Sequence, residues 1–125
     1  MRTAKQGLGA AGERLARQHL VRHGYEILET NVRLAGLGEI DIVARDGETL
    51  AFVEVRTRRG EGYGSPEESL TDAKRARLAA LAQAWLELRQ QESLPWRVDL
   101  VAVQLRLSGG VERLEIVKDV VEDLA

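Results

Sequence analysis

The sequence of 125 residues contains no cysteine. The chain therefore has no disulfide framework, no thiol nucleophile and no cysteine-ligated zinc site. Its longest apolar runs are too short to span a membrane, and its N-terminal segment lacks the apolar core of a secretory signal. We expect a cytoplasmic protein that does not associate with membranes.

The sequence also lacks an excess of basic charge, since the formal net charge is −2 and the pI is near 5.7. Nonspecific affinity for nucleic acid comes mainly from basic residues that neutralise phosphates, so a protein that coats DNA without preference is not expected. Hydrophobic residues make up 44% of the chain and charged residues 30%, as in ordinary globular proteins. The length suits a single domain over residues 1–125.

The segment from Gly38 to Arg59 has the pattern of a β-hairpin. Two apolar runs, residues 40–44 and 50–55, flank the turn signal Asp46-Gly47. Carboxylates interrupt both runs, and side chains alternate between the faces of a strand. A loop of Asp46-Gly47 places Asp41 opposite Phe52, whereas a loop over residues 46–49 places Asp41 opposite Glu54. In either register Asp41 and Glu54 are direct or diagonal neighbours, about 5–8 Å apart.

Two interpretations of this acidic pair remain open. Like charges opposite each other destabilise a sheet, and a carboxylate in the apolar run around Glu54 loses hydration. A divalent cation would remove both objections, because Mg²⁺ and Mn²⁺ accept hard oxygen ligands. Alternatively, the hairpin has one solvated face on which Glu54 and Arg56 form an ordinary surface pair. The apolar Val43 and Phe52 on the same face count against a wholly solvated surface.

The rest of the chain predicts two helices and three further strands. A helix over residues 8–23 ends at Gly24, and residues 25–30 have the pattern of a strand. Ser65-Pro66 signals a helix start, Thr71-Asp72 offers a second one, and an apolar stripe continues to residue 91. Strands over 96–107 and 111–117 follow, with a short helix over 118–125. The order α-β-β-β-α-β-β predicts an α/β fold with a mixed β-sheet flanked by helices.

Further charged residues accompany the hairpin. Glu13 lies on or beside the inward face of the first helix, where it would reach the adjacent sheet. Asp99, within an apolar strand, is interpreted as structural, with a backbone or arginine partner. A basic rim is predicted from residues that follow the hairpin or open the second long helix, namely Arg56, Arg58, Arg59, Lys74, Arg75 and Arg77. Tyr63, in a glycine-rich loop, is available to stack on a base. The alternatives are solvated ends of elements and a plain linker.

The combination of an acid on the first helix with GEIDIVARDG, FVEVRTR and GSPEESLTDAKRARL resembles the YraN-like family of small uncharacterised bacterial proteins. The match runs from about Gly12 to Trp85, with a weaker one at RVDLVAV. That family is similar to archaeal Holliday-junction resolvases in the restriction-endonuclease-like, or PD-(D/E)XK, superfamily. The resemblance implies a restriction-endonuclease-like fold, branched DNA as substrate, Mg²⁺ or Mn²⁺ as cofactor and a two-fold homodimer.

The superfamily signature is an Asp followed on the next strand by a Glu-x-Lys triplet. By resemblance Asp41 takes the Asp position, Glu54 takes the Glu position and Arg56 stands where the superfamily has Lys. Glu13 would be the helix carboxylate that completes the metal site, and the carbonyl of Val55 would be a backbone ligand.

Three functional hypotheses follow. In the first, the protein is a metal-dependent DNA endonuclease in which Asp41, Glu54, Arg56 and Glu13 act in catalysis. Arginine stabilises charge but does not act as a base, so Lys74 is considered as a replacement ammonium. The second hypothesis is a non-catalytic DNA-binding module on the same fold, which Arg56 favours. The third is a plain interaction protein that binds neither metal nor DNA.

Overall fold

The predicted order of helices and strands is confirmed. A computed structural model describes residues 4–62 and 64–121. Its elements in chain order are α1 (Ala4–Arg22), β1 (Glu26–Leu34), β2 (Gly38–Asp46), β3 (Thr49–Arg59), the 3₁₀ helix η1 (Glu67–Ser69), α2 (Asp72–Leu88), β4 (Trp96–Leu105) and β5 (Val111–Val117). None of the described helices combines the length and the apolar content needed to cross a membrane.

The five strands form one mixed sheet in the order β1-β2-β3-β4-β5. β3 and β4 pair in parallel, and the other neighbours pair antiparallel. The parallel pair follows from α2, because the chain must return across the sheet between β3 and β4. The α/β class with helices on a mixed sheet is therefore confirmed.

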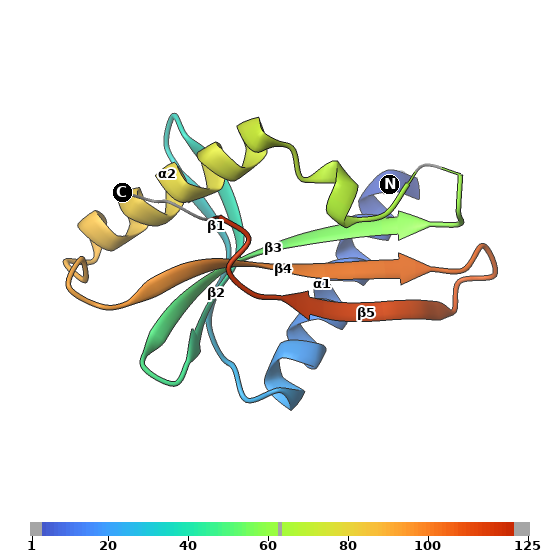
Figure 1. Ribbon diagram of the computed structural model, residues 1–125, viewed down its shortest axis with the longest axis horizontal. Coiled ribbons are helices and arrows are strands. Elements are labelled where there is room, and N and C mark those ends of the chain that lie inside the picture. Colours follow the sequence, from blue (N-terminus) through green and yellow to red (C-terminus); the bar gives the residue numbers. More distant parts are fainter. Residues whose placement is uncertain (1–3, 63, 122–125) are drawn as a thin grey trace.

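Two apolar cores lie on opposite faces of the sheet, one under each long helix (Figure 1). α2 packs Leu81 and Trp85 against Phe52 on one face. On the other face α1 packs Ala16 and Leu20 against the sheet. Because both faces are covered, β4 is buried almost throughout, as expected of a central strand.

The register of the hairpin is the one that places Asp41 opposite Glu54. Ile42 pairs with Val53, and Asp46 pairs with Thr49. The connection is thus Gly47-Glu48, with Gly47 in the left-handed region at a φ of 63°. Of the two predicted registers, the second is confirmed, although the loop itself is shorter than predicted.

Two other predictions are corrected. β1 continues four residues beyond the predicted end at residue 30. The predicted helix at the tail is wrong over residues 118–121, because this part has no regular structure. Its backbone donors are used along β4 instead: the Asp119 N–H donates to Asp99 Oδ1 (3.0 Å) and the Val120 N–H to the Val98 carbonyl (2.8 Å). Residues 122–125 of that prediction lie outside the described residues, as does Tyr63.

Asp99 has the structural role predicted for it. Its carboxylate is fully buried and accepts hydrogen bonds from the Tyr25 hydroxyl (2.9 Å), from Arg97 Nε (2.9 Å) and from the Asp119 N–H. A buried charge needs such partners. Asp99 therefore ties the tail to the sheet.

Candidate active site

The sheet divides between β2 and β3. The pairing of these strands ends at Ile42 and Val53, whereas β2 stays paired with β1 back to Gly38 and β3 stays paired with β4 up to Arg59. The β1–β2 hairpin therefore turns away from β3 (Figure 1). We call the opening between β2 before Ile42 and β3 after Val53 the fork.

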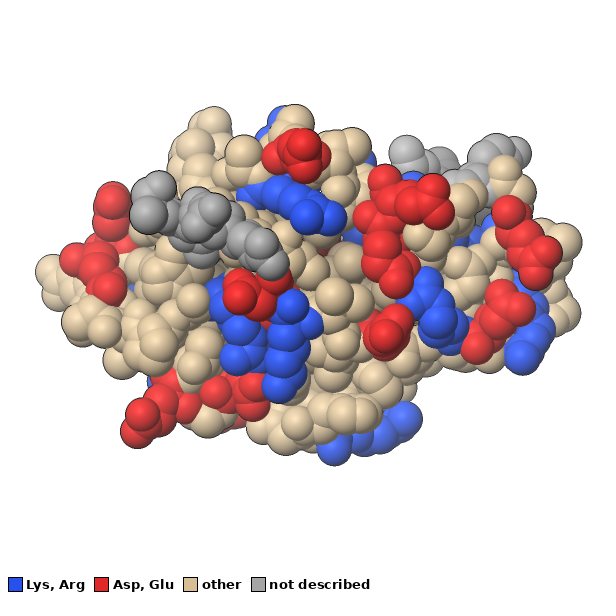
Figure 2. All heavy atoms as spheres, in the orientation of Figure 1, with Lys and Arg blue, Asp and Glu red and all other residues tan. Residues whose placement is uncertain are grey.

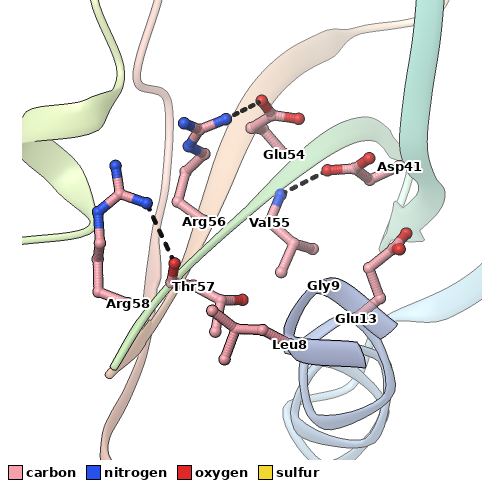
Figure 3. A pocket seen from close by; sticks show the side chains of 9 residues that line it. All are labelled: Leu8, Gly9, Glu13, Asp41, Glu54, Val55, Arg56, Thr57 and Arg58. Atoms are coloured by element: carbon pink, nitrogen blue, oxygen red, sulfur yellow. Dashed lines mark hydrogen bonds and ion pairs between the residues drawn. The ribbon is translucent and has the colours of Figure 1, made fainter. Parts of the chain in front are cut away.

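Asp41 and Glu54 lie at the base of the fork, directly after Ile42 and Val53, which form the last pair between β2 and β3. The alternation of β2 is interrupted here, because Ile40 packs in the same core as Val43 while Ile42 packs in the other core. Asp41 Oδ2 accepts a hydrogen bond from the Val55 N–H at 2.9 Å (Figure 3). The N–H and C=O of one strand residue point to the same edge. The Val55 carbonyl therefore also faces the fork.

Glu54 and Arg56 follow each other on one face of β3. Arg56 Nη1 lies 3.5 Å from Glu54 Oε2, and the two side chains are 22% and 15% exposed. Arg56 Nε donates to Ser69 Oγ at 2.8 Å. The guanidinium is thus held between a carboxylate of the fork and the 3₁₀ helix η1.

Glu13 reaches the fork from α1. Gly12 is buried and faces Thr57 of β3, where no Cβ would fit, so the helix lies close to the strand. In Figure 3 the Glu13 side chain points toward Asp41. Its Oε1 accepts from Asn31 Nδ2 at 2.8 Å, and the same amide nitrogen lies 3.1 Å from Glu39 Oε1.

Asn31 is a site residue that the sequence analysis missed. It bridges two carboxylates, and its φ of 51° is left-handed within β1. Asparagine is depleted in strands and is one of few non-glycine residues that visit this region. The one available signal was that the only asparagine of the chain lies directly after a predicted strand.

The electrostatics of the fork disfavour ionised carboxyl groups. Burial raises the pKa of Asp41 to about 8, and the hydrogen bond and the charge of Glu54 add to this rise, while the Val55 N–H opposes it. The pKa of Glu13 is also raised, first by burial and less by the charge of Asp41, whereas the hydrogen bond from Asn31 lowers it. Ionising Asp41 or Glu13 is thus unfavourable, because each carboxylate would be partly desolvated and would repel its acidic neighbours.

The predicted basic residues separate into two groups. Arg56 and Arg58 line the fork, and Arg58 Nη1 donates to the Thr57 carbonyl at 3.2 Å. Arg58 Nε is buried with no hydrogen-bond partner among the described residues. The others lie outside this lining: Arg59, Arg75 and Arg77 are exposed, and Lys74 Nζ donates to the Ser69 carbonyl at 3.1 Å.

The fork opens into a cavity of about 320 Å³. Its lining contains carboxylates at one end and arginines at the other: Leu8, Gly9, Glu13, Asp41, Glu54, Val55, Arg56, Thr57 and Arg58 (Figure 3). On the face shown in Figure 2, by contrast, acidic and basic side chains of the described residues mix in small clusters, without a broad basic surface. The described residues of this face therefore offer no broad basic surface to an anion.

The fork offers oxygen donors of the kind that a hard cation takes. The carboxylates of Asp41 and Glu54 and the carbonyl of Val55 face one opening, and oxygen ligands suit Mg²⁺ and Mn²⁺. Over residues 4–62 and 64–121, no three or more His, Cys, Asp or Glu side chains gather closely enough to hold a metal ion. Two carboxylates are sufficient for Mg²⁺, which usually keeps several waters.

Comparison with known proteins places the chain among bacterial relatives. The family model described as "Uncharacterised protein family UPF0102" matches residues 12–103. A UPF0102 protein of Dehalococcoides mccartyi is 48% identical over 111 residues, which cover 89% of each chain. One of Roseiflexus castenholzii is 49% identical over 93% of this chain and 94% of its own. One of Beutenbergia cavernae is 46% identical over 94% and 98%.

Proposed function

We propose that this chain, which belongs to the uncharacterised protein family UPF0102, is a metal-dependent endonuclease that hydrolyses DNA phosphodiester bonds. The observation that carries the proposal is the position of Asp41 beside Glu54 at the fork, where burial first and the neighbouring Glu54 second raise the pKa of Asp41 to about 8. A divalent cation between them would remove the repulsion. Site carboxylates with strongly raised pKa values are typical of functional sites.

The cation would be Mg²⁺ or Mn²⁺, held by Asp41, Glu54 and the Val55 carbonyl. When bound, such an ion activates a water molecule and stabilises the charge that develops on a phosphate. Glu13, which lines the same cavity, would orient the attacking water. Arg56 stabilises negative charge on the phosphate and stays protonated throughout.

The substrate class follows from the lining of the cavity and from the resemblance. Arg56 and Arg58 stand two residues apart along β3, on one face, at the end of the cavity away from Asp41. We propose that they bind phosphates of a DNA strand. We propose branched DNA as the substrate because the family resembles Holliday-junction resolvases. Two cuts on such a substrate need a homodimer with two-fold symmetry.

Arg56 supports a second candidate function. The superfamily lysine is replaced by a residue that does not release a proton, and this arginine is bound by Ser69 and Glu54. A fold that keeps the carboxylates but has lost efficient turnover would bind branched DNA without cutting it. This rival is a non-catalytic DNA-binding module.

The test is cleavage of labelled four-way junction, flap, single-stranded and duplex DNA by the purified protein in Mn²⁺ and in Mg²⁺. We expect cleavage of a branched substrate, lowered about 100-fold or more in Asp41→Asn and in Glu54→Gln, because each removes charge that holds the ion. Glu48→Gln, on the exposed hairpin turn, is the matched control for loss of a carboxylate.

The outcomes separate the two candidates. Cleavage that persists in both site variants would come from a contaminating nuclease and would refute the proposal. Binding of the junction by the parent protein, with no cleavage in either metal, would favour the binding module. In that case Arg56→Lys tests whether the arginine at this position is what prevents cleavage.

A further inference from the structure

We propose that Ser69 is a positioning residue for Arg56, and that the segment around η1 is built to orient the arginine that replaces the superfamily lysine. This inference rests on the proposed function, since it concerns the same site. Nothing in the motif of the superfamily points to Ser69, which lies 13 residues after Arg56. The assignment comes from the contacts of the two side chains.

The hydroxyl of Ser69 has only one way to serve both of its neighbours. Ser69 Oγ lies 2.5 Å from the Pro66 carbonyl and 2.8 Å from Arg56 Nε. A carbonyl accepts only and a guanidinium donates only. The single hydroxyl proton of Ser69 therefore goes to Pro66, and its oxygen accepts from Arg56. The direction of this relay is fixed by chemistry.

The segment that carries the hydroxyl is itself anchored. Ser65 and Glu68 form a reciprocal capping pair, in which the Glu68 N–H donates to Ser65 Oγ (3.2 Å) and the Ser65 N–H donates to Glu68 Oε1 (3.1 Å). Arg113 of β5 binds Glu67 through two nitrogens, at 3.0 Å and 2.7 Å. The segment that carries Ser69 is thus anchored both by its own capping pair and by β5.

Lys74 and Leu70 complete this anchoring. Lys74 Nζ donates to the Ser69 carbonyl at 3.1 Å, and Leu70 is 4% exposed within the core under α2. Lys74, considered from the sequence as a replacement ammonium, is thus directed at the backbone of the residue that binds Arg56. Lys74 thus stabilises the position of Ser69 and, through it, that of the Arg56 side chain.

These contacts fix the orientation of the Arg56 guanidinium group. An arginine side chain has many rotamers, and ordering it costs entropy. The bond from Nε to Ser69 fixes the plane of the guanidinium, and Nη1 then lies 3.5 Å from Glu54 Oε2. A lysine has no Nε–H beside its terminal group and could not use Ser69 in this way. Ser69 is therefore matched to arginine at position 56.

The experiment combines NMR of the Arg56 side chain with kinetics of DNA cleavage. In ¹⁵N spectra of the whole protein, assigned with Arg56→Lys, the Arg56 Nε–Hε resonance should be protected from exchange with water. We expect Ser69→Ala to abolish this protection, and Ser69→Thr to keep it because the hydroxyl remains. Ser93→Ala, at an exposed serine between α2 and β4, is the matched control and should change nothing.

In cleavage assays, Ser69→Ala should lower kcat about tenfold with KM within about twofold, because the hydrogen bond orients a charge that acts in the transition state. Ser69→Thr should restore kcat. In an Arg56→Lys background Ser69→Ala should have no further effect, which a merely structural role of Ser69 would not produce.

The results that overturn the inference are distinct from those that overturn the proposed function. An Arg56 resonance that keeps its protection in Ser69→Ala refutes the positioning role, whether or not the protein cuts DNA. A loss of activity that is equal in the parent protein and in the Arg56→Lys background refutes it as well. Absence of cleavage by the parent protein with an intact Ser69-dependent resonance refutes only the nuclease.

Discussion

At Asp41 a partly buried carboxyl group lies beside a second one, and the pKa is held at about 8 instead of the ordinary 3.8. Loss of hydration is the larger cause, and the neighbouring Glu54 is the next. The folded protein therefore binds this proton more tightly than the unfolded chain does. In the absence of metal, ionisation of Asp41 therefore lowers the free energy of unfolding.

This linkage predicts how stability depends on pH. Because the folded pKa lies above the unfolded one, the free energy of unfolding should fall as pH rises from about 4 to about 8. Asp41→Asn has no proton to lose, so its profile should be flatter and its stability at pH 8.5 should exceed that of the parent. Chemical unfolding in EDTA at pH 5, 6.5 and 8.5 measures this, with Glu48→Gln as the control. Parallel profiles for Asp41→Asn and the parent would show that Asp41 ionises without cost.

At the scale of elements, the approach of α1 to β3 places Glu13 at the fork. The approach depends on Gly12, which is buried against Thr57. Glycine in the middle of a helix is about 1 kcal/mol less favourable than alanine. The close contact between α1 and β3 explains the glycine at position 12, since a Cβ there would collide with the Thr57 hydroxyl oxygen.

Gly12→Ala should therefore destabilise the protein by about 1–3 kcal/mol, although it improves helix propensity. Gly9→Ala, one turn earlier in α1, is the matched control, because a Cβ there meets no atom within 4 Å. It should be neutral or stabilising by up to about 1 kcal/mol. Urea unfolding of both variants measures the difference. Thr57→Ala, combined with Gly12→Ala, should restore part of the lost stability. Equal stabilities of the two variants would show that α1 does not need its close packing.

Elements with a regular apolar period were predictable. The hairpin, α1, α2 and the strand after it follow from patterns that extend over one segment each, and the face shared by Glu54 and Arg56 follows from the alternation of a strand. The region at Ser65 to Thr71 offered two helix starts. The structure uses both, since η1 follows the first and α2 begins after Thr71, whose hydroxyl caps the Lys74 N–H.

The features that the sequence could not predict depend on contacts between distant segments. A helix is predicted for the tail, but its backbone donors bind Asp99 and Val98 instead. Asn31 extends β1 in a left-handed conformation because its amide reaches Glu13 and Glu39. The bond from Arg56 to Ser69 joins a strand to a 3₁₀ helix. No local pattern encodes any of these.

At the scale of the whole molecule, the two helix-covered faces of the sheet leave the fork as an opening between two of its inner strands. β3 and β4 are buried between α1 and α2, so the open end of the β2–β3 pair is where polar groups from several elements meet. The net charge is only −2, and acidic side chains from α1, β2 and β3 nevertheless face the same region. A cation bound there would bridge β2 and β3 and so act on the stability of the entire fold, because the pairing of these two strands holds the β1–β2 hairpin to the rest of the sheet.

A divalent cation should therefore stabilise the folded protein in a pH-dependent way. A ligand that binds only the folded state at 100 times its dissociation constant adds about 2.7 kcal/mol, so Mn²⁺ should raise Tm clearly at pH 8. At pH 5.5 the rise should be much smaller, because the ion must displace the proton that the raised pKa of Asp41 retains. Thermal unfolding of the parent, Asp41→Asn, Glu54→Gln and Glu48→Gln tests this, and only the two site variants should lose the shift. If both site variants kept the full shift, the ion would bind elsewhere, and the crowded carboxylates would need another explanation.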